Sequence, residues 1–273
     1  MNISDEELVS ICIATYNGGK FIREALESIK SQSYRNIEVV VTDDCSSDDT
    51  LDICGEYDFV TVYRNKKRLG LVDNWNSAVS KSSGKYIKLM GQDDVLAPDS
   101  VKIQVEALKN TPGATLSIGR SGVISEKSEP LMTRSIANKD FVMDGTKFAK
   151  KALWTRNIYC EPVNAMYTAE AAERAGTYNR EFIYVPDWDY AIELSLQGKV
   201  CYSASMISYF RISSGSETSF LYRKKNYEML KDTDRMFNKY KERLGLSLFQ
   251  ELFFKSMTRL RMRARLLFIR FKK

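Results

Sequence analysis

Paired carboxylates follow two apolar runs of this chain, and their placement indicates a ligand crevice. Asp93 and Asp94 come shortly after the run of residues 86–90, and Asp43 and Asp44 follow the run of residues 37–42. Carboxylates at a strand's exit suit a hard divalent cation that keeps part of its water and bridges to phosphates. Because ligands collect beyond the carboxyl ends of strands in open α/β sheets, two such pairs indicate one crevice. Either pair alone is equally typical of a turn or a helix cap.

The absence of histidine restricts the chemistry further. It excludes Ser-His-Asp hydrolysis, Cys-His catalysis and histidine-ligated metals, so a general base must be a carboxylate, lysine, tyrosine or cysteine. The five cysteines are widely spaced and odd in number, which indicates neither a zinc site nor a disulfide framework. The N-terminal residues are acidic and no apolar run of about 18 residues occurs, so we expect a cytoplasmic protein that does not span a membrane.

Strand and helix patterns alternate between residues 8 and 110. We expect strands at residues 8–14, 37–42, 59–63 and 86–90, and helices at residues 20–30, 50–55, 71–81 and 99–109. Strands joined by helices predict right-handed crossovers and a mainly parallel sheet. The glycine-rich dinucleotide and P-loop motifs are both absent.

Four segments, taken in order, resemble the family 2 glycosyltransferases, which are inverting enzymes with the GT-A nucleotide-diphospho-sugar transferase fold. The resemblance covers roughly residues 8–212, and its motifs are IATYN (13–17), VVVTDDCSSDDT (39–50), GKYIKLMGQDD (84–94) and VPDWD (185–189). It implies an α/β catalytic domain over residues 1–215, with a mainly parallel central sheet flanked by helices. Within it we expect a nucleotide-binding half of about residues 1–110 and an acceptor half of about residues 111–215, followed by a helical C-terminal extension over residues 216–273.

The resemblance implies a nucleotide site at the ends of the first two strands. Thr15, Tyr16 and Asn17 lie where the family's first loop embraces the nucleoside. Asp44 lies where a carboxylate binds the base, and Asp43 is its supporting neighbour. A UDP- or dTDP-linked sugar is the implied donor. The basic residues at positions 64 and 66–68 form either a solvated loop face or a contact with the diphosphate.

A divalent cation, Mn²⁺ or Mg²⁺, is implied at Asp93 with Asp94 as a helper. Asp93 matches the second acid of the family's Asp-x-Asp metal motif, but Gly91 replaces the first. Many relatives also carry a histidine near the diphosphate, and this chain has none. Arg211 or Ser213 is the candidate to meet the phosphates instead.

Asp187 matches the family's catalytic base, in a stretch where Pro186 replaces the usual glutamate. Inversion needs one base, because the acceptor hydroxyl attacks from the face opposite the leaving diphosphate. Trp188 and Asp189 are the implied acceptor-binding residues, with Trp188 stacking on a sugar. The alternatives are a packing role for Trp188 and helix-cap roles for the two acids.

The C-terminal segment is basic and amphipathic. We expect a charged helix over residues 222–243 and a second helix over residues 246–273, whose apolar residues recur at intervals of three and four. From Lys255 onward there are eight Lys or Arg and no acids, so the chain's formal charge of +6 lies in this tail. Such a helix either lies on an anionic membrane surface or packs on the catalytic domain or a second subunit.

The implied function is transfer of a sugar to a hydroxyl of a glycan or lipid-linked glycan, in bacterial surface polysaccharide synthesis, at the inner face of the cell membrane or in the cytoplasm. A nucleic-acid partner is not expected. Two other functions stay open. Gly91 and the missing histidine leave room for a catalytically inactive carbohydrate- or nucleotide-binding domain. A sugar nucleotidyltransferase is the other, although it would need a glycine-rich loop after the first strand.

Overall fold

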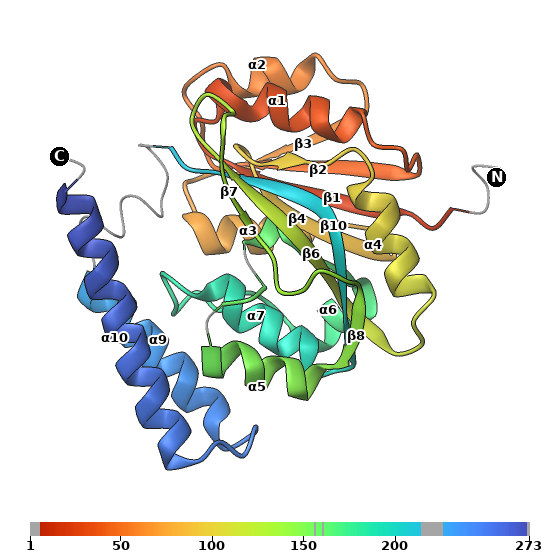
Figure 1. The fold of residues 1–273 in the computed structure, drawn as a ribbon. Helices are drawn as coiled ribbons and strands as arrows, with labels where there is room; N and C mark the ends of the chain where they lie inside the picture. Colours follow the sequence, from red (N-terminus) through yellow and green to blue (C-terminus); the bar gives the residue numbers. More distant parts are fainter. Residues whose placement is uncertain (1–5, 156, 160, 214–225, 272–273) are drawn as a thin grey trace.

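The computed structural model describes residues 6–155, 157–159, 161–213 and 226–271. One ten-stranded sheet forms its centre, in the order β3-β2-β1-β4-β9-β6-β10-β5, with β7 beside β6 and β8 beside β10 (Figure 1). The strands are β1 (Val9–Thr15), β2 (Ile37–Asp43), β3 (Val60–Arg64), β4 (Tyr86–Gly91), β5 (Val95–Leu96), β6 (Ala114–Ile124), β7 (Pro130–Arg134), β8 (Phe141–Asp144), β9 (Met166–Thr168) and β10 (Lys199–Arg211).

The nucleotide-binding half forms as the sequence patterns predict. β1 pairs in parallel with both β2 and β4, and β2 pairs in parallel with β3. The connecting helices are α1 (Gly19–Lys30), α2 (Thr50–Gly55), α3 (Leu71–Val79) and α4 (Ser100–Lys109). Every expected strand and helix of this half is confirmed, with ends that differ by one or two residues.

The acceptor half changes the sheet from parallel to mixed. β6 and β10 pair in parallel, whereas β5, β7, β8 and β9 join the sheet through antiparallel pairs. Four further elements belong to this half: α5 (Gly145–Thr155), the short 3₁₀ helix η2 (Pro162–Asn164), α6 (Ala169–Ala175) and α7 (Pro186–Ser195). The parallel arrangement therefore describes the first half and the central β6–β10 pair.

Two cores cover the two faces of the sheet. On one face, α1, α2 and α4 bury residues such as Leu26, Ile53 and Val105. On the other face, α3, α5, α6 and α7 bury residues such as Phe148 and Ile192. Both layers are visible in Figure 1. Burial of this kind is the main stabilising contribution to the fold and holds the strand ends in place.

The C-terminal helices α9 (Asn226–Lys241) and α10 (Leu248–Phe271) form an antiparallel pair beside α5 and α7 (Figure 1). Phe254 of α10 is buried, with its ring centroid 4.6 Å from that of Phe237 and 6.2 Å from that of Trp188. Phe253 stacks on Trp154 of α5 at 4.6 Å. The expected helical extension is therefore present and packs on the catalytic domain through one face of α10. The expected boundary between residues 215 and 216 lies outside the described residues.

Candidate active site

The strand register brings the first acid pair and the first loop to one edge of the sheet. Thr15 at the end of β1 lies opposite Asp43 at the end of β2, and Ala14 lies opposite Gly91 at the end of β4. Asp93 and Asp94 follow Gly91 after Gln92, so the two acid pairs leave β2 and β4, the strands on either side of β1, at the same edge. This is the edge where open α/β sheets hold ligands.

The loop from β1 to α1 is fastened to β4 by Gln92. The Gln92 side-chain oxygen accepts hydrogen bonds from the Thr15 hydroxyl and from the backbone amide of Tyr16, the latter at 2.8 Å. Asn17 adopts a left-handed φ of 48° and receives the Ser47 amide on its side-chain oxygen at 2.9 Å. Asparagine tolerates this conformation better than most residues. The predicted nucleoside loop therefore has a fixed shape, and Gln92, which the sequence did not single out, holds it.

Asp44 has different partners from those expected. Its carboxylate is buried and accepts hydrogen bonds from the backbone amides of Leu69 and Gly70, at 2.7 and 2.8 Å, and from the Asn65 side chain at 3.0 Å. These contacts fasten the loop between β3 and α3. Three of the roughly four acceptor sites of this carboxylate thus serve the protein, and the binding of a base by Asp44 stays a prediction.

Asp43 supports the turn that follows β2. One carboxylate oxygen accepts the Ser46 amide at 3.0 Å and lies 3.6 Å from Nε of Arg64. The other oxygen is buried without a hydrogen-bond partner among the described residues. Cys45 in this turn has a left-handed φ of 66°. Asp43 thus helps to fix the conformation of this turn.

Arg68 covers the aromatic ring of the nucleoside loop. Its guanidinium carbon lies 3.4 Å from the centroid of the Tyr16 ring, a close cation–π contact. Arg68 is otherwise exposed. Of the basic residues at positions 64 and 66–68, Arg68 therefore places its charge over the predicted nucleotide site, and Arg64 is engaged with the turn after β2.

The second acid pair divides into a half-buried and a fully buried carboxylate. Asp93 is half-buried, whereas Asp94 is buried and accepts hydrogen bonds from the backbone amides of Gly91 and Arg211, at 3.1 and 3.4 Å. Burial raises the pKa of Asp93, and burial together with the neighbouring negative charges of Asp93 and Glu161 raises the pKa of Asp94 further. No group of three or more metal-ligating side chains occurs within the described part of the chain.

Arg211 does not face the crevice, contrary to the suggestion that it meets the phosphates. It is fully buried, and its guanidinium donates to the backbone oxygens of Asp93 and Ser125 and to the Glu24 carboxylate, at 2.9, 3.0 and 2.6 Å. Ser213 is also buried. Arg211 therefore supports the backbone on which Asp93 and Asp94 sit.

Asp187 lies in the first turn of α7. Pro186 occupies the first helical position, where its missing amide costs nothing, and acids are favourable at this end of a helix. Burial raises the pKa of Asp187 to about 7. The hydrogen bond from the Trp188 backbone amide lowers this pKa, and the negative charge of Glu161 raises it. A carboxylate with this pKa is suited to general base chemistry near neutral pH.

Glu161 connects the two acidic regions, and the sequence analysis missed it. It precedes η2, pairs with Arg134 of β7, and lies close enough to Asp94 and Asp187 for its charge to raise the pKa of both. Asp187 therefore belongs to the same electrostatic site as the acids after β4. A single glutamate before a proline is not a recognisable motif, so the sequence pattern does not indicate that Glu161 lies near these acids.

Trp188 and Asp189 are buried and contact the C-terminal helices. Trp188 is buried against Phe254, and both Asp189 oxygens bind Lys239 of α9, at 2.8 and 3.0 Å. The Tyr240 hydroxyl also donates to Asp189, at 2.7 Å. These contacts favour the alternative of a packing role for Trp188, and the acceptor-binding roles of the two residues stay predictions. A sequence window of five residues did not reveal that the C-terminal helices cover this turn.

A mixed α/β sheet with acidic residues at the exits of β2 and β4, and a further acid in a later helix, defines a GT-A type glycosyltransferase. The chain belongs to glycosyl transferase family 2, whose family model matches residues 10–176.

Curated relatives agree with this assignment. The chain is 27% identical over 215 residues to the Escherichia coli UDP-Glc:alpha-D-GlcNAc-diphosphoundecaprenol beta-1,3-glucosyltransferase WfaP, covering 77% of this chain and 79% of that protein. It is 25% identical to an uncharacterised glycosyltransferase of Haemophilus influenzae, covering 84% and 72%. A match to an uncharacterised glycosyltransferase of Rickettsia prowazekii has 37% identity but covers only 37% of this chain and 32% of that protein.

Solved structures show the same fold. The S. aureus TarS 1-349 structure in complex with UDP-GlcNAc aligns with a TM-score of 0.67 and 17% identity, covering 90% of this chain and 78% of that chain. At this identity the likeness concerns the fold alone.

Proposed function

We propose that the protein transfers a sugar, with inversion, from a nucleoside diphosphate donor to a hydroxyl of a lipid-linked glycan. The observation that carries this proposal is that Asp187 is a partly buried carboxylate with a pKa of about 7. The charge of Glu161 acts both on Asp187 and on Asp94 after β4. One base on the acceptor side and anion-binding groups on the donor side are what inversion requires.

In the proposed reaction Asp187 takes the proton from the acceptor hydroxyl. The oxygen then attacks the anomeric carbon from the face opposite the diphosphate, and the bond from that carbon to the phosphate oxygen breaks. The electron pair leaves with the nucleoside diphosphate. We assign the stabilisation of that leaving charge to Arg68, since prearranged positive charge lowers such barriers.

A divalent cation fits Asp93 better than Asp94. Asp93 is the less buried of the two, while the Asp94 carboxylate is engaged with backbone amides. One protein carboxylate supplies few ligands, which suits Mg²⁺ or Mn²⁺ because such ions keep several waters and bind substrate phosphates. The cation would supply charge neutralisation at the diphosphate. Calorimetry of UDP binding with and without Mn²⁺ tests this, and equal affinities in wild type and Asp93→Ala under both conditions would count against a cation at Asp93.

For the donor we propose a UDP-linked sugar, and for the acceptor a lipid-linked glycan. The name of the E. coli relative specifies UDP-glucose and a diphosphoundecaprenol-linked sugar, and a TarS structure was solved with UDP-GlcNAc. A panel of UDP- and dTDP-linked sugars, assayed for slow donor hydrolysis and for thermal stabilisation, tests the proposal. Hydrolysis of one UDP-sugar supports it. Binding without hydrolysis or transfer would instead indicate an inactive binding domain, and formation of the sugar nucleotide from a sugar phosphate would indicate a nucleotidyltransferase.

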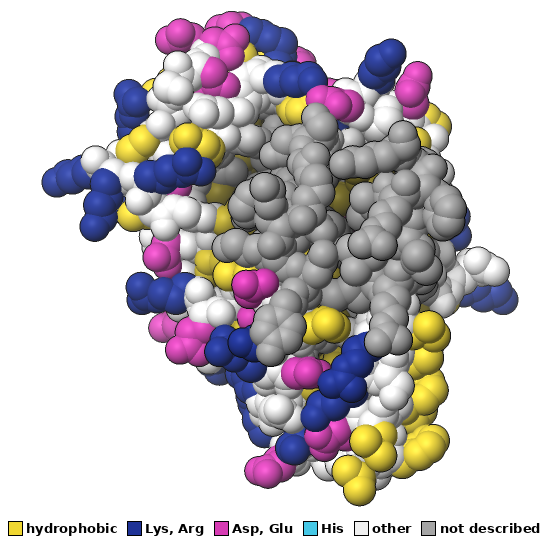
Figure 2. Space-filling view, turned by 90° about the vertical axis from the view of Figure 1, so that its left-hand side faces the viewer, with side chains coloured by type: hydrophobic (Ala, Val, Ile, Leu, Met, Phe, Trp, Pro, Cys, Tyr) yellow, Lys and Arg dark blue, Asp and Glu magenta, His cyan; other side chains and the backbone are white. Residues whose placement is uncertain are grey.

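We also propose that α10 contacts an anionic membrane surface. None of the described helices is long and apolar enough to cross a bilayer. The outer side of α10 exposes Leu248, Phe249, Leu252 and Leu260, with 58–71% of each side chain accessible. Figure 2 shows apolar side chains gathered at the lower right of that view. The same helix continues into the tail that carries eight Lys or Arg and no acid from Lys255 onward. Exposed apolar side chains beside basic ones suit the boundary between anionic headgroups and acyl chains, where each base contributes about 1 kcal/mol.

Vesicle sedimentation tests the membrane contact. We expect the full chain to pellet with vesicles of phosphatidylglycerol and phosphatidylcholine, and less with phosphatidylcholine alone or at high salt. The double variant Leu248→Gln/Leu252→Gln should pellet less than wild type. The matched control Leu131→Gln/Met132→Gln alters two equally exposed residues of β7 and should not differ. Equal pelleting with charged and uncharged vesicles, and by wild type and the α10 variant, would contradict the membrane contact. So would a protein that binds no vesicles and whose dimer is lost in the α10 variant.

A further inference from the structure

The loop that leads into the Asp187 turn is held by a buried acid of the C-terminal helix α9. Both amides concerned donate to one oxygen of Asp232: the backbone amide of Ile183 at 2.6 Å and that of Tyr184 at 3.0 Å. Asp232 is only 3% exposed. A buried carboxylate is costly unless charge-assisted hydrogen bonds compensate, so this contact is a specific one.

Apolar packing reinforces the same contact. Met229, one turn before Asp232 on α9, is fully buried and packs against Ile183 and Tyr184. The residues of α9 that face the loop thus hold both its backbone and its side chains.

A second contact with α9 follows Asp187 by two residues. Lys239 and Tyr240 bind the Asp189 carboxylate, and the Tyr240 hydroxyl also lies 3.1 Å from the Asp189 backbone oxygen. Arg243 and Lys239 bind Glu193 one turn further along α7. The chain is therefore fastened to α9 both before and after Asp187.

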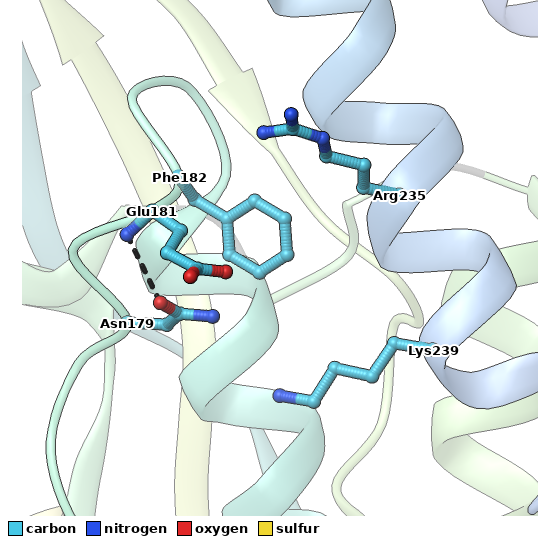
Figure 3. A pocket seen from close by; sticks show the side chains of 5 residues that line it. All are labelled: Asn179, Glu181, Phe182, Arg235 and Lys239. Carbon is cyan, nitrogen blue, oxygen red and sulfur yellow. Dashed lines mark hydrogen bonds between the residues drawn. The ribbon is translucent and has the colours of Figure 1, made fainter.

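The part of the loop that precedes Ile183 is not closely packed against α9. An open hollow of about 710 Å³ lies there, lined by Asn179, Glu181, Phe182, Arg235 and Lys239 (Figure 3). In Figure 3, Arg235 and Lys239 extend from α9 toward the loop across this space. Because side chains do not fill this part of the seam, the hydrogen bonds at Asp232 and Asp189 have a larger share in fixing the loop.

We propose that α9 positions Asp187 for proton transfer, with Asp232 fixing the loop before it and Lys239 and Tyr240 fixing the turn after it. This inference rests on the proposed role of Asp187 as the base. It makes Asp232, Lys239 and Tyr240 positioning residues of the reaction, and it makes the C-terminal extension a part of the active site's support. A displacement of about 1 Å in a reacting group lowers a rate by about a hundredfold, so such support has a measurable effect.

The test compares Asp232→Ala, Asp232→Asn and Tyr240→Phe with Asp234→Ala. Asp234 lies on the same helix, 3.9 Å from the guanidinium of Arg259 of α10, and serves as the matched control. We expect Asp232→Ala to lower kcat by roughly ten- to a hundredfold with little change in UDP affinity. The acid limb of the kcat profile should also move to lower pH, because water then reaches Asp187 and its pKa falls toward the usual range. Asp232→Asn should restore part of kcat, since the amide oxygen still accepts a hydrogen bond. Tyr240→Phe should lower kcat less.

Unchanged kcat and an unchanged acid limb in Asp232→Ala, with Asp187→Asn inactive, would overturn the inference while leaving the proposed function intact. Activity retained in Asp187→Asn would instead count against the proposed function. Should Asp232→Ala fold poorly by thermal melting, the decision passes to Asp232→Asn and Tyr240→Phe. A wild-type kcat and pH profile in both would overturn the inference.

Discussion

Gln92 and Tyr16 exchange two hydrogen bonds between the end of β4 and the loop that follows β1. The Gln92 side-chain oxygen accepts the Tyr16 amide at 2.8 Å, and its side-chain nitrogen donates to the Tyr16 carbonyl at 3.1 Å. Gln92 lies between Gly91 and Asp93, so one side chain joins the proposed nucleoside loop to the acids that follow β4. The loop proposed for the nucleoside and the acid proposed for the cation are therefore connected through one side chain.

Gln92→Ala should weaken UDP binding by about thirtyfold, because its two hydrogen bonds with Tyr16, of about 1 kcal/mol each, hold the loop in shape. Isothermal titration calorimetry measures this change. Gln197→Ala is the matched control, since the Gln197 side chain donates to two backbone oxygens but lies after α7, away from this loop. Equal UDP affinities for the two variants would argue against the loop's role.

The rate of transfer should depend on pH with a half-maximal value near pH 7. Asp187 must be deprotonated to accept a proton, and burial raises its pKa to about 7. Activity is then lost as the pH falls through that value. Glu161→Gln removes one of the causes of the raised pKa, so the acid limb of kcat should move to lower pH. A limb that stays in place, or moves upward, would contradict the assignment of this titration to Asp187.

Arg211→Met should lower the free energy of unfolding by about 3 kcal/mol, because it leaves the buried backbone oxygens of Asp93 and Ser125 without their donor. Urea denaturation measures the change. Arg23→Met removes an exposed ion pair with Glu56 and should have a far smaller effect. Similar losses of unfolding free energy in the two variants would contradict the stabilising role of the buried Arg211 contacts.

Lys88 predicts a pH-dependent stability. It is fully buried in β4 and donates a hydrogen bond to Gln104 at 2.7 Å. Burial lowers its pKa to about 7, although the negative charge of Asp94 acts to raise that pKa. The unfolded lysine binds its proton more tightly than the folded one, so folding releases a proton between about pH 7 and pH 10. The stability of wild type relative to Lys88→Met should therefore rise by about 4 kcal/mol over that window and be constant below it. Parallel stability curves for the two proteins from pH 7 to 10 would refute this.

The first half of the fold was predictable because its elements are regular. Each strand from β1 to β4 is a short apolar run followed by a turn and a helix of suitable period, as around Val39 and Leu26. The second half was not predicted in detail. Its strands join by antiparallel pairs whose partners are far apart in sequence, such as Tyr86 with Thr168, and no local pattern specifies such pairing.

The site was predictable where a motif and a strand end coincide, and not where a contact comes from a distant segment. Thr15, Asp43 and Asp93 lie at the expected edge. The partners of Asp44 and Asp189 come from a loop 25 residues away and from a helix 50 residues away. Only the folded chain shows that these two acids serve the protein itself.

Substitution of Asp187 by asparagine tests the central claim most directly, because it removes the proposed base with almost no change in shape. We predict that Asp187→Asn lowers kcat for transfer to a lipid-linked acceptor by about a thousandfold, while calorimetry shows UDP affinity within about twofold of wild type, as expected for a group that does not bind the donor. Transfer at more than about a tenth of the wild-type rate would contradict the account.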